Sequence, residues 1–403
     1  MTALASAPVA DPLVDRSLFG VYVHVPFCLT RCHYCDFVTY TGMEGLRRPY
    51  AAALAAEAEL AVAALGPERP EVTSVFVGGG TPTLLPPADL ARVLERLRGL
   101  LAHRPGAEVT VEANPETVDR AVAEGLAAAG VTRVSMGAQS FDDRVLGALG
   151  RPHDARQPGR AVAALRAAGI GTLNLDLIFG CPHEDAASWA ATLAAAVALG
   201  PEHLSAYALT VEPATKFGRL VASGRMEPPG EDLLADRYET ACATLAGHGY
   251  RHYEVSNWAS DDGRVRDGPG TPLPELASRH NLTYWRRGGY LGLGAGAHEF
   301  TGGTRRWNVA GVPEYLAAVT AGRRPTAGEE RLSAWEAAFE LLALRLRTAD
   351  GLDAGEARRL GVDPAGPDVA VLRAAGLLAP GPGIALTERG MFLHGEVVTR
   401  LAP

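Results

Sequence analysis

The stretch VYVHVPFCLTRCHYC at residues 21–35 joins a short β-branched run to three closely spaced cysteines. Valine alternates with larger side chains over residues 21–25, which is typical of a β-strand. A proline ends the run, and the loop behind it carries Cys28, Cys32 and Cys35, with three and then two residues between them. A strand that leads directly into clustered thiols predicts an α/β fold with a metal site at the carboxyl end of a β-strand.

The same alternation of short β-branched runs with Ala/Leu-rich stretches of helical period continues from Gly20 to about Leu209. It predicts βαβ units of a parallel sheet, and the most regular helix is expected at Tyr50–Leu65. Six such units are fewer than the eight of a closed barrel, so an open partial barrel and a doubly wound sheet both fit. The expected strands are Val21–Val25, Thr73–Val77, Glu108–Glu112, Thr132–Met136, Thr172–Ile178 and His203–Leu209.

Polar or glycine-bearing segments lie at the end of each expected strand. Because the carboxyl ends of parallel strands meet at one rim, we expect these segments to form a single site, although each also fits an ordinary turn. The segments are Pro26–Cys28, Gly78–Pro82, Glu112–Pro115, Gly137–Ser140, Asp176 and Tyr207–Ala208.

The pattern loosens beyond Thr210, and four regions are expected along the chain. They are a disordered leader (1–17), a partial barrel (18–235), a mixed α+β extension with a mobile loop at 260–278 (236–325), and a small helical, winged-helix-like C-terminal domain (326–403). In the last region we expect a long helix at Ala327–Arg347, helices near Ala354–Leu360 and Val369–Ala375, and a short hairpin at Ile384–Thr387.

Composition restricts the partners. The 403 residues carry 38 Lys and Arg against 46 Asp and Glu, so the net charge of −8 gives no reason to expect nucleic acid. No apolar run is long enough to span a bilayer, which leaves only peripheral membrane contact, and the N-terminus lacks the features of a signal peptide. We therefore expect a cytoplasmic protein, in which clustered thiols indicate metal rather than a disulfide.

Three thiolates on one loop suit a [4Fe–4S] cluster, which takes four ligands. With three cysteines one iron stays open, and a molecule with an adjacent amine and carboxylate can chelate it. The alternative is a structural zinc site in which His24 or His33 is the fourth ligand, although zinc motifs normally pair two Cys-x-x-Cys units that lie well apart.

The Cys-x3-Cys-x2-Cys motif after a first strand resembles the radical S-adenosylmethionine superfamily. Within it the chain resembles the oxygen-independent coproporphyrinogen III oxidase group. The resemblance implies a partial (β/α)6 barrel of TIM type and a [4Fe–4S] cluster on the three cysteines, whose open iron binds S-adenosylmethionine. The residues that carry it are Tyr22–Cys28, Gly78–Pro82, Glu112, Gln139, Arg151, Asp176 and Tyr253–Trp258.

The resemblance also implies which residues contact S-adenosylmethionine. The glycines would let the backbone approach closely, so that free N–H and C=O groups hold the ammonium and carboxylate of the ligand. Ordinary alternatives remain, such as Glu112 as a solvated strand end or Arg151 as a surface cation. The implied contacts are Tyr22, Tyr34, Gly79, Gly80, Thr81, Glu112, Gln139, Arg151, Asp176 and Ala208.

Two features favour the heme-chaperone branch of this group over the oxidases. The oxidases carry a fourth cysteine two residues past the third, where this chain has Phe37. The run His280-Asn-Leu-Thr-Tyr-Trp285 matches a heme-binding H-N-x-x-Y-W motif of the branch, in which His280 would ligate iron while Asn281, Tyr284 and Trp285 surround the porphyrin. A structural role for this histidine is the alternative.

The resemblance thus implies a protein that binds heme and passes it to acceptor hemoproteins. The competing hypothesis is an enzyme that reductively cleaves S-adenosylmethionine and abstracts hydrogen from a porphyrinogen or another substrate. A zinc-stabilised barrel without redox chemistry is the third reading.

Overall fold

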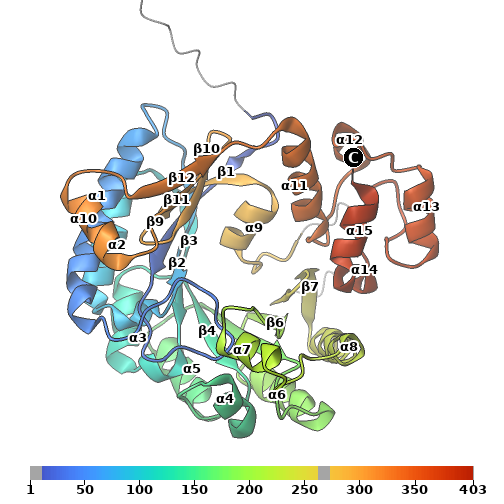
Figure 1. The fold of residues 1–403 in the computed structure, drawn as a ribbon, viewed down its shortest axis with the longest axis horizontal. Coiled ribbons are helices and arrows are strands. Elements are labelled where there is room, and N and C mark those ends of the chain that lie inside the picture. The colour runs from blue at the N-terminus through green and yellow to red at the C-terminus, as the bar shows by residue number, and fades with distance from the viewer. Residues whose placement is uncertain (1–10, 262–272, 403) are drawn as a thin grey trace, which may run out of the picture.

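The computed structural model describes residues 11–261 and 273–402, and within them the strands form one curved, twelve-stranded sheet. From edge to edge the strand order is β12-β11-β10-β9-β1-β2-β3-β4-β5-β6-β8-β7 (Figure 1). The strands are β1 (Asp15–Val25), β2 (Val72–Gly79), β3 (His103–Ala113), β4 (Arg133–Gln139), β5 (Thr172–Phe179), β6 (His203–Ala208), β7 (Tyr250–Glu254), β8 (Asn257–Ser260), β9 (Gly288–Leu293), β10 (His298–Thr301), β11 (Thr304–Asn308) and β12 (Thr326–Glu330).

The six strands expected from the sequence are present, and β1 to β6 pair in parallel in chain order. β9 adds a further parallel strand on the free side of β1. Antiparallel strands extend both edges, so β12 and β7 end the sheet on opposite sides and the described sheet does not close. The predicted partial barrel is therefore confirmed.

Most helices lie on the convex side of the sheet, whereas α9 lies within its curve (Figure 1). The helices are α1 (Arg47–Ala64), α2 (Pro87–Leu100), α3 (Arg120–Ala128), α4 (Asp143–Leu149), α5 (Gln157–Ala167), α6 (Ala186–Ala198), α7 (Lys216–Ala222), α8 (Glu231–Gly247), α9 (Arg279–Trp285), α10 (Val312–Thr320), α11 (Ala334–Leu346), α12 (Ala354–Arg359), α13 (Pro367–Ala374), α14 (Glu388–Phe392) and α15 (His394–Leu401), with 3-10 turns η1 (Glu44–Leu46), η2 (Pro82–Leu84) and η3 (Pro115–Thr117).

β1 is the strand that positions the cysteine loop. It lies between β2 and β9, and Val21, Val23 and Val25, which share one face of the strand, are fully buried, while His24 on the other face is buried as well. The loop that follows returns to its own start, because the Cys28 N–H donates to the Tyr40 carbonyl (2.9 Å) and the Tyr40 N–H donates to the Pro26 carbonyl (2.7 Å). The fold thus fixes both ends of the cysteine loop.

The C-terminal region has its own hydrophobic core, built from side chains of α11 to α15. The predicted long helix at Ala327–Arg347 is wrong in its first part, because β12 occupies Thr326–Glu330 and α11 begins only at Ala334. A short hairpin-like pairing is present at Ile384–Thr387, because Leu386 forms an antiparallel bridge with Leu378 and the Thr387 N–H donates to the Leu377 carbonyl, and Ile384 also bridges to Leu352. The division at residue 326 stays a prediction, although β12 belongs to the main sheet.

The predicted leader is also shorter than expected. β1 begins at Asp15, and the Asp11 carboxylate accepts from Arg287 at 2.8 Å, so residues 11–17 belong to the fold. Residues 1–10, and 262–272 of the predicted mobile loop, lie outside the described residues. Among the described helices, none combines the length and the apolar character needed to cross a bilayer.

Candidate functional site

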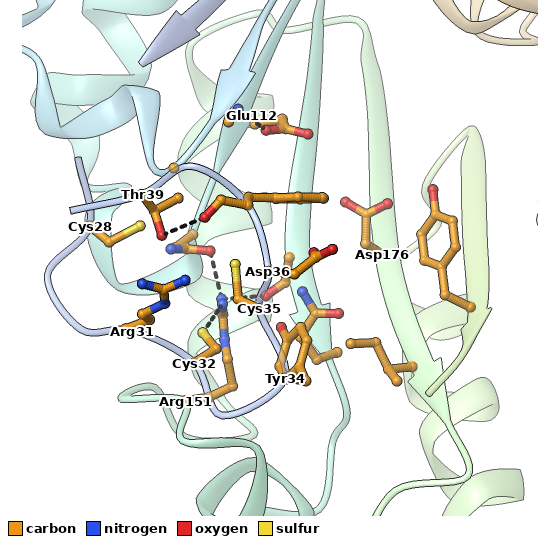
Figure 2. A pocket seen from close by; sticks show the side chains of 18 of the residues that line it. Cys28, Arg31, Cys32, Tyr34, Cys35, Asp36, Thr39, Glu112, Arg151 and Asp176 are labelled. Atoms are coloured by element: carbon orange, nitrogen blue, oxygen red, sulfur yellow. Dashed lines mark hydrogen bonds between the residues drawn. The ribbon is translucent and has the colours of Figure 1, made fainter. Parts of the chain in front are cut away.

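A cavity of about 450 Å³ lies at the carboxyl ends of the parallel strands, where the sequence predicted a common site. The cysteine loop forms one wall, and Glu112 and Asp176 project from β3 and β5 (Figure 2). Eight of the ten predicted S-adenosylmethionine contacts line this cavity: Tyr34, Gly79, Gly80, Glu112, Gln139, Arg151, Asp176 and Ala208.

The three clustered cysteines all line the cavity as free thiols. Two of them receive hydrogen bonds from the surrounding strands: Thr81 Oγ1 donates to Cys28 Sγ at 3.8 Å, and Arg151 Nη1 donates to Cys32 Sγ at 3.4 Å. Burial raises the pKa of Cys28 to about 11, against the Thr81 hydrogen bond, so an empty site holds this thiol in its protonated form. Three thiols on one loop, two of them with donors aimed at the sulfur, form a ligand set that fits an iron–sulfur cluster.

The glycines hold the cysteine loop against β2 more than they offer free backbone groups. A Cβ on Gly79, whose φ is +108°, would lie 2.3 Å from the His24 ring, and one on Gly80 would lie 2.6 Å from the Phe27 carbonyl. The Gly79 N–H donates to the Glu112 carboxylate. The Gly80 N–H donates to the Val25 carbonyl, and the Thr81 N–H donates to the Phe27 carbonyl. The expectation of free N–H donors at Gly79, Gly80 and Thr81 is therefore wrong.

The two carboxyl groups in the cavity hold protons more tightly than usual. Burial raises the pKa of Glu112 to about 7, the Gly79 N–H opposes the rise, and the charge of Asp176 adds to it. Burial also raises the pKa of Asp176, although Ser205, Ser135 and Asn174 donate hydrogen bonds to it. A positively charged group of a ligand beside them would favour their ionised form, in which both accept N–H groups.

Gln139 has an unusual backbone at the end of β4. Its φ is +64°, in the left-handed region, and the pairing of β4 with β5 is irregular between Gly137 and Gln139. Such a conformation costs about 1–3 kcal/mol in a residue other than glycine and is concentrated at ligand sites. The bulge places the Gln139 side chain in the cavity wall.

Arg151 ties the far side of the cavity together. Besides its bond to Cys32, its Nη2 donates to the Asn114 side chain at 2.6 Å and to the Gly137 carbonyl at 2.8 Å (Figure 2). The alternative of a surface cation is thereby wrong, because the guanidinium spans β3, β4 and the cysteine loop.

Two predicted contacts lie outside the cavity lining. The Tyr22 hydroxyl bonds to His24 Nδ1 at 2.8 Å, and Thr81 is buried between Cys28 and Asn114. In turn, sequence reasoning missed Asn114 and Tyr207 as lining residues, although both stand in the turn segments that the strand pattern had marked. Which residue of such a segment faces inward depends on local backbone geometry that the pattern does not contain.

The zinc alternative takes His24 or His33 as its fourth ligand, and both rings are engaged elsewhere. The His24 ring is bonded at both nitrogens, to the Tyr22 hydroxyl and to the Val38 carbonyl (2.8 Å). The His33 ring is likewise bonded to the Ala148 carbonyl (2.8 Å) and to Lys216 Nζ (2.8 Å). Neither imidazole therefore presents a lone pair to the cysteine loop.

Comparison with known proteins decides the family. The chain is 42% identical over 387 residues to the heme chaperone HemW of Mycobacterium tuberculosis (strain ATCC 25618 / H37Rv), which covers 95% of this chain and 94% of that protein. The chain belongs to the HemW family. The HemW of Bacillus subtilis (strain 168) is 33% identical over 336 residues, 83% of this chain and 84% of that protein.

Two further comparisons fit the HemW family. A family model described as the Radical SAM superfamily matches residues 22–196, and membership of that superfamily implies a [4Fe–4S] cluster and S-adenosylmethionine. The solved structure of coproporphyrinogen III oxidase (HemN) from Escherichia coli, described as a radical SAM enzyme, matches with a TM-score of 0.79 and 22% identity, covering 99% of this chain and 91% of that chain. At that identity the match bears on the fold, and it agrees with the unclosed barrel.

In this HemW-family chain the predicted heme motif forms α9. His280 is 1% exposed, and its ring is bonded at both nitrogens, to Ser74 Oγ (2.9 Å) and to the Tyr284 hydroxyl (2.8 Å). It also stacks on Phe76, with 5.1 Å between ring centroids. Burial lowers the pKa of His280 to about 3, so the imidazole is neutral at physiological pH.

The other motif residues point in different directions. Tyr284 lies beside His280, whereas the Trp285 ring lies under the guanidinium of Arg347, with 4.4 Å between the Trp285 ring centroid and Arg347 Cζ. The Trp285 Nε1 is buried and has no hydrogen-bond partner among the described residues. The Asn281 backbone N–H donates to Ser278 Oγ at 3.3 Å, which caps the start of α9. The structure therefore joins His280 to Tyr284 and packs Trp285 against Arg347.

Proposed function

We propose that this HemW-family chain is a heme chaperone that binds heme and transfers it to acceptor hemoproteins. The observation that carries the proposal is the similarity to a protein named heme chaperone HemW over 95% of this chain. The sequence motif on α9 supports it independently, because a neutral imidazole is a good axial ligand for heme iron.

In the same proposal Cys28, Cys32 and Cys35 hold a [4Fe–4S] cluster, and S-adenosylmethionine occupies the cavity beside it. The eight lining residues named above would bind the cofactor, with Glu112 and Asp176 as acceptors and Arg151 fixing the wall that carries Cys32. When bound, the cluster supplies the electron that radical chemistry on S-adenosylmethionine needs. Tyr22 and Thr81 act through their bonds to His24 and Cys28 as positioning residues.

Phe37 supports chaperone function over oxidase function. It lines the cavity and is 60% exposed, at the place where the resemblance implies a fourth cysteine in the oxidases. An exposed phenyl ring at the rim offers apolar contact to a porphyrin face or to a partner protein, which a cysteine does not.

We propose His280 as the axial heme ligand, with Asn281, Tyr284 and Trp285 around it. Ligation through Nε2 requires the hydrogen bond to Tyr284 to be given up, and ligation through Nδ1 requires loss of the bond to Ser74. Ser74 is fully buried whereas Tyr284 is only partly buried, so Nε2 is the nitrogen nearer to an approaching heme. Heme binding at this residue therefore involves movement of Tyr284.

Heme titration followed by the Soret band tests this proposal. We expect saturable binding by the wild type, loss of the axial-ligand spectrum in His280→Ala, and retained or tighter binding in Tyr284→Phe, which frees Nε2 without removing the imidazole. His298→Ala is the control, because His298 is exposed and stacks on Trp307 outside the motif. Circular dichroism verifies that each variant is folded.

Absence of saturable heme binding in the wild type would contradict the chaperone proposal, whereas an unchanged spectrum in folded His280→Ala would contradict only the ligand assignment. Formation of 5′-deoxyadenosine that depends on an added porphyrinogen, after anaerobic reconstitution and reduction, would instead support the enzyme hypothesis.

A further inference from the structure

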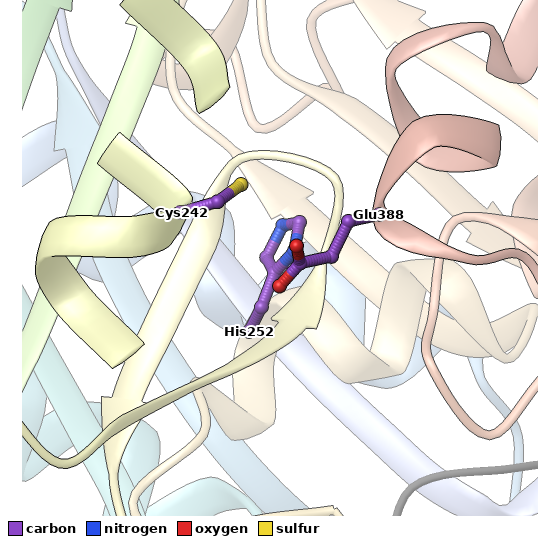
Figure 3. A group of neighbouring side chains, drawn as sticks. All are labelled: Cys242, His252 and Glu388. Carbon is purple, nitrogen blue, oxygen red and sulfur yellow. The ribbon is translucent and has the colours of Figure 1, made fainter. Parts of the chain in front are cut away.

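A second group of metal-ligating side chains lies away from the cysteine loop, between the barrel and the C-terminal region. Cys242 comes from α8, His252 from β7 and Glu388 from the first residue of α14 (Figure 3). One ligand atom of each, the thiol sulfur, a ring nitrogen and a carboxylate oxygen, lies within 4.8 Å of the other two. α8 and β7 follow each other in the chain, whereas α14 lies in the C-terminal region, so the fold brings Glu388 to the other two ligands.

His252 is prepared to be a metal ligand. Its Nε2 lies 3.3 Å from the Val255 carbonyl and 3.4 Å from the Tyr238 hydroxyl, which donates its own proton to Val255, so Nε2 carries the ring proton. The other nitrogen, Nδ1, then carries a lone pair, and it is shielded from solvent and has no hydrogen-bond partner among the described residues. Burial lowers the pKa of His252 to about 4, so the ring is neutral.

The surroundings hold this ring in place. The His252 ring stacks on Trp258, with 4.2 Å between centroids and 8° between planes, and Tyr238 meets its edge. An imidazole fixed by packing, with one nitrogen donating to a backbone carbonyl and the other left as an acceptor, is the arrangement that metal-bound histidines show. A buried acceptor without a donor is otherwise costly.

We propose that Cys242, His252 and Glu388 form a zinc-binding site. Zn²⁺ accepts thiolate, imidazole and carboxylate ligands, whereas Mg²⁺ and Ca²⁺ require oxygen ligands. Neighbouring ligand atoms of a tetrahedral zinc site lie about 3.5 Å apart, so small side-chain rotations close the present spacing.

A fourth ligand has room beside the site. A cavity of about 330 Å³ borders Cys242 and Glu388, and its other walls include Tyr238, Phe392 and Ala246. A water molecule in this cavity completes four-coordination. The ion would then join α8 and β7 to α14 and so fasten the C-terminal region to the barrel.

Zinc binding to the protein with its iron–sulfur cluster in place tests the proposal. After anaerobic dialysis against Zn²⁺ at micromolar free concentration, we expect one zinc per chain, with a zinc-edge X-ray absorption spectrum of one sulfur and otherwise nitrogen or oxygen neighbours. The sulfur count separates this site from zinc misplaced on the cysteine loop, which would show up to three sulfurs.

Variants identify the ligands. Cys242→Ser and His252→Gln are each expected to lower zinc affinity at least 10-fold, and so is Glu388→Gln, a change at an exposed position that leaves the core intact. Cys181→Ala is the matched control, because Cys181 is a buried cysteine in a separate apolar cluster. No retained zinc, several sulfur neighbours, or equal affinity in wild type and folded Glu388→Gln would each overturn the proposal.

Discussion

At the residue scale, the cysteine loop and Gln139 line the same cavity but differ in backbone conformation. The thiols lie on a loop whose backbone is relaxed, whereas Gln139 reaches the wall only through a left-handed backbone at the end of β4. The strain is offset by the packing of the fully buried β4 around it.

Replacement of single cysteines tests the ligand set. Cys28→Ala, Cys32→Ala and Cys35→Ala are each expected to abolish stable cluster binding, because two thiolates do not hold a cubane cluster. The wild type should contain about four iron and four sulfide per chain after anaerobic reconstitution. Cys181→Ala should keep the full content, and a cluster of wild-type stability in any of the three loop variants would contradict the assignment.

Substitution of Gln139 separates strain from ligand contact. Gln139→Gly removes both the side chain and the left-handed strain, so the free energy of unfolding is expected to rise by about 1 kcal/mol while affinity for S-adenosylmethionine falls. Gln139→Ala removes only the side chain, so its affinity should fall equally without the gain in stability. Urea denaturation and equilibrium dialysis measure the two effects, and equal stability of the two variants would refute the strain.

Some residues of the site could be predicted from the sequence, and others could not. The polar ends of the strands identified Glu112 and Asp176, and the family resemblance added Arg151; all three line the cavity. Tyr22 could not be placed, because its hydroxyl turns to His24 in a bond that only the folded β1 permits. For the same reason both hydrogen bonds of His280 were invisible in the motif.

At the scale of elements, a buried carboxyl group joins α1 to the strands and helix beyond β9. Glu57 is fully buried and accepts from the Gly294 N–H (2.7 Å), the Asn308 amide (2.6 Å) and the Tyr315 hydroxyl (2.7 Å). Burial raises its pKa to about 7, and these three hydrogen bonds oppose the rise. The folded chain therefore binds a proton at Glu57 more tightly than the unfolded chain.

The pH dependence of stability follows from this pKa. The contribution of a raised carboxyl pKa is fully present below about pH 4.5 and is lost as the pH rises through about 7. Over this window the free energy of unfolding should fall by up to about 1.4 kcal/mol per pH unit from this group. In Glu57→Gln that component is absent, so the variant gains on the wild type from pH 5 to pH 7. Parallel profiles in urea denaturation would contradict the expectation.

Elements that depend on distant pairing were the ones the sequence did not reveal. The Ala- and Glu-containing segment Thr326–Glu330 favours a helix locally, yet it pairs with β11, where Glu329 and Glu330 meet Arg306 and Arg305 at 3.0 and 3.1 Å. β9 was missed because its parallel pairing with β1 joins segments far apart in the chain. β1 to β6 were predictable because each pairs with its neighbour in sequence.

At the scale of the whole molecule, Arg287 joins three parts of the chain. Its buried guanidinium donates to Asp11 (2.8 Å) near the N-terminus and to Glu340 (2.9 Å) on α11, and it lies over the Phe300 ring of β10. The C-terminal region is thus fastened to the sheet by a charge that is only 2% exposed.

Removal of the Arg287 charge should weaken the attachment of the C-terminal region to the sheet. Arg287→Met removes the cation that pairs with both Asp11 and Glu340, of which Glu340 keeps Arg305, so we expect a loss of about 3 kcal/mol in the free energy of unfolding. Arg286→Met is the control, because Arg286 forms a single 3.0 Å pair with Asp350 and is 34% exposed. Its loss should be about 0.5 kcal/mol, and similar losses for the two variants in urea denaturation would contradict the special role of Arg287.

The two backbone hydrogen bonds that close the cysteine loop determine what iron contributes to the folded chain. Joining the ends of a loop costs conformational entropy. Here the hydrogen bond between Tyr40 and Pro26 already holds the ends of the cysteine loop together without a metal, so the cluster does not have to close the loop. The protein should therefore differ from a zinc finger, which unfolds without its ion. Removal of iron with a chelator is expected to abolish the visible absorption of the cluster and to leave the far-ultraviolet circular dichroism of the protein unchanged. A chain emptied by oxygen would then stay folded and ready to be reloaded.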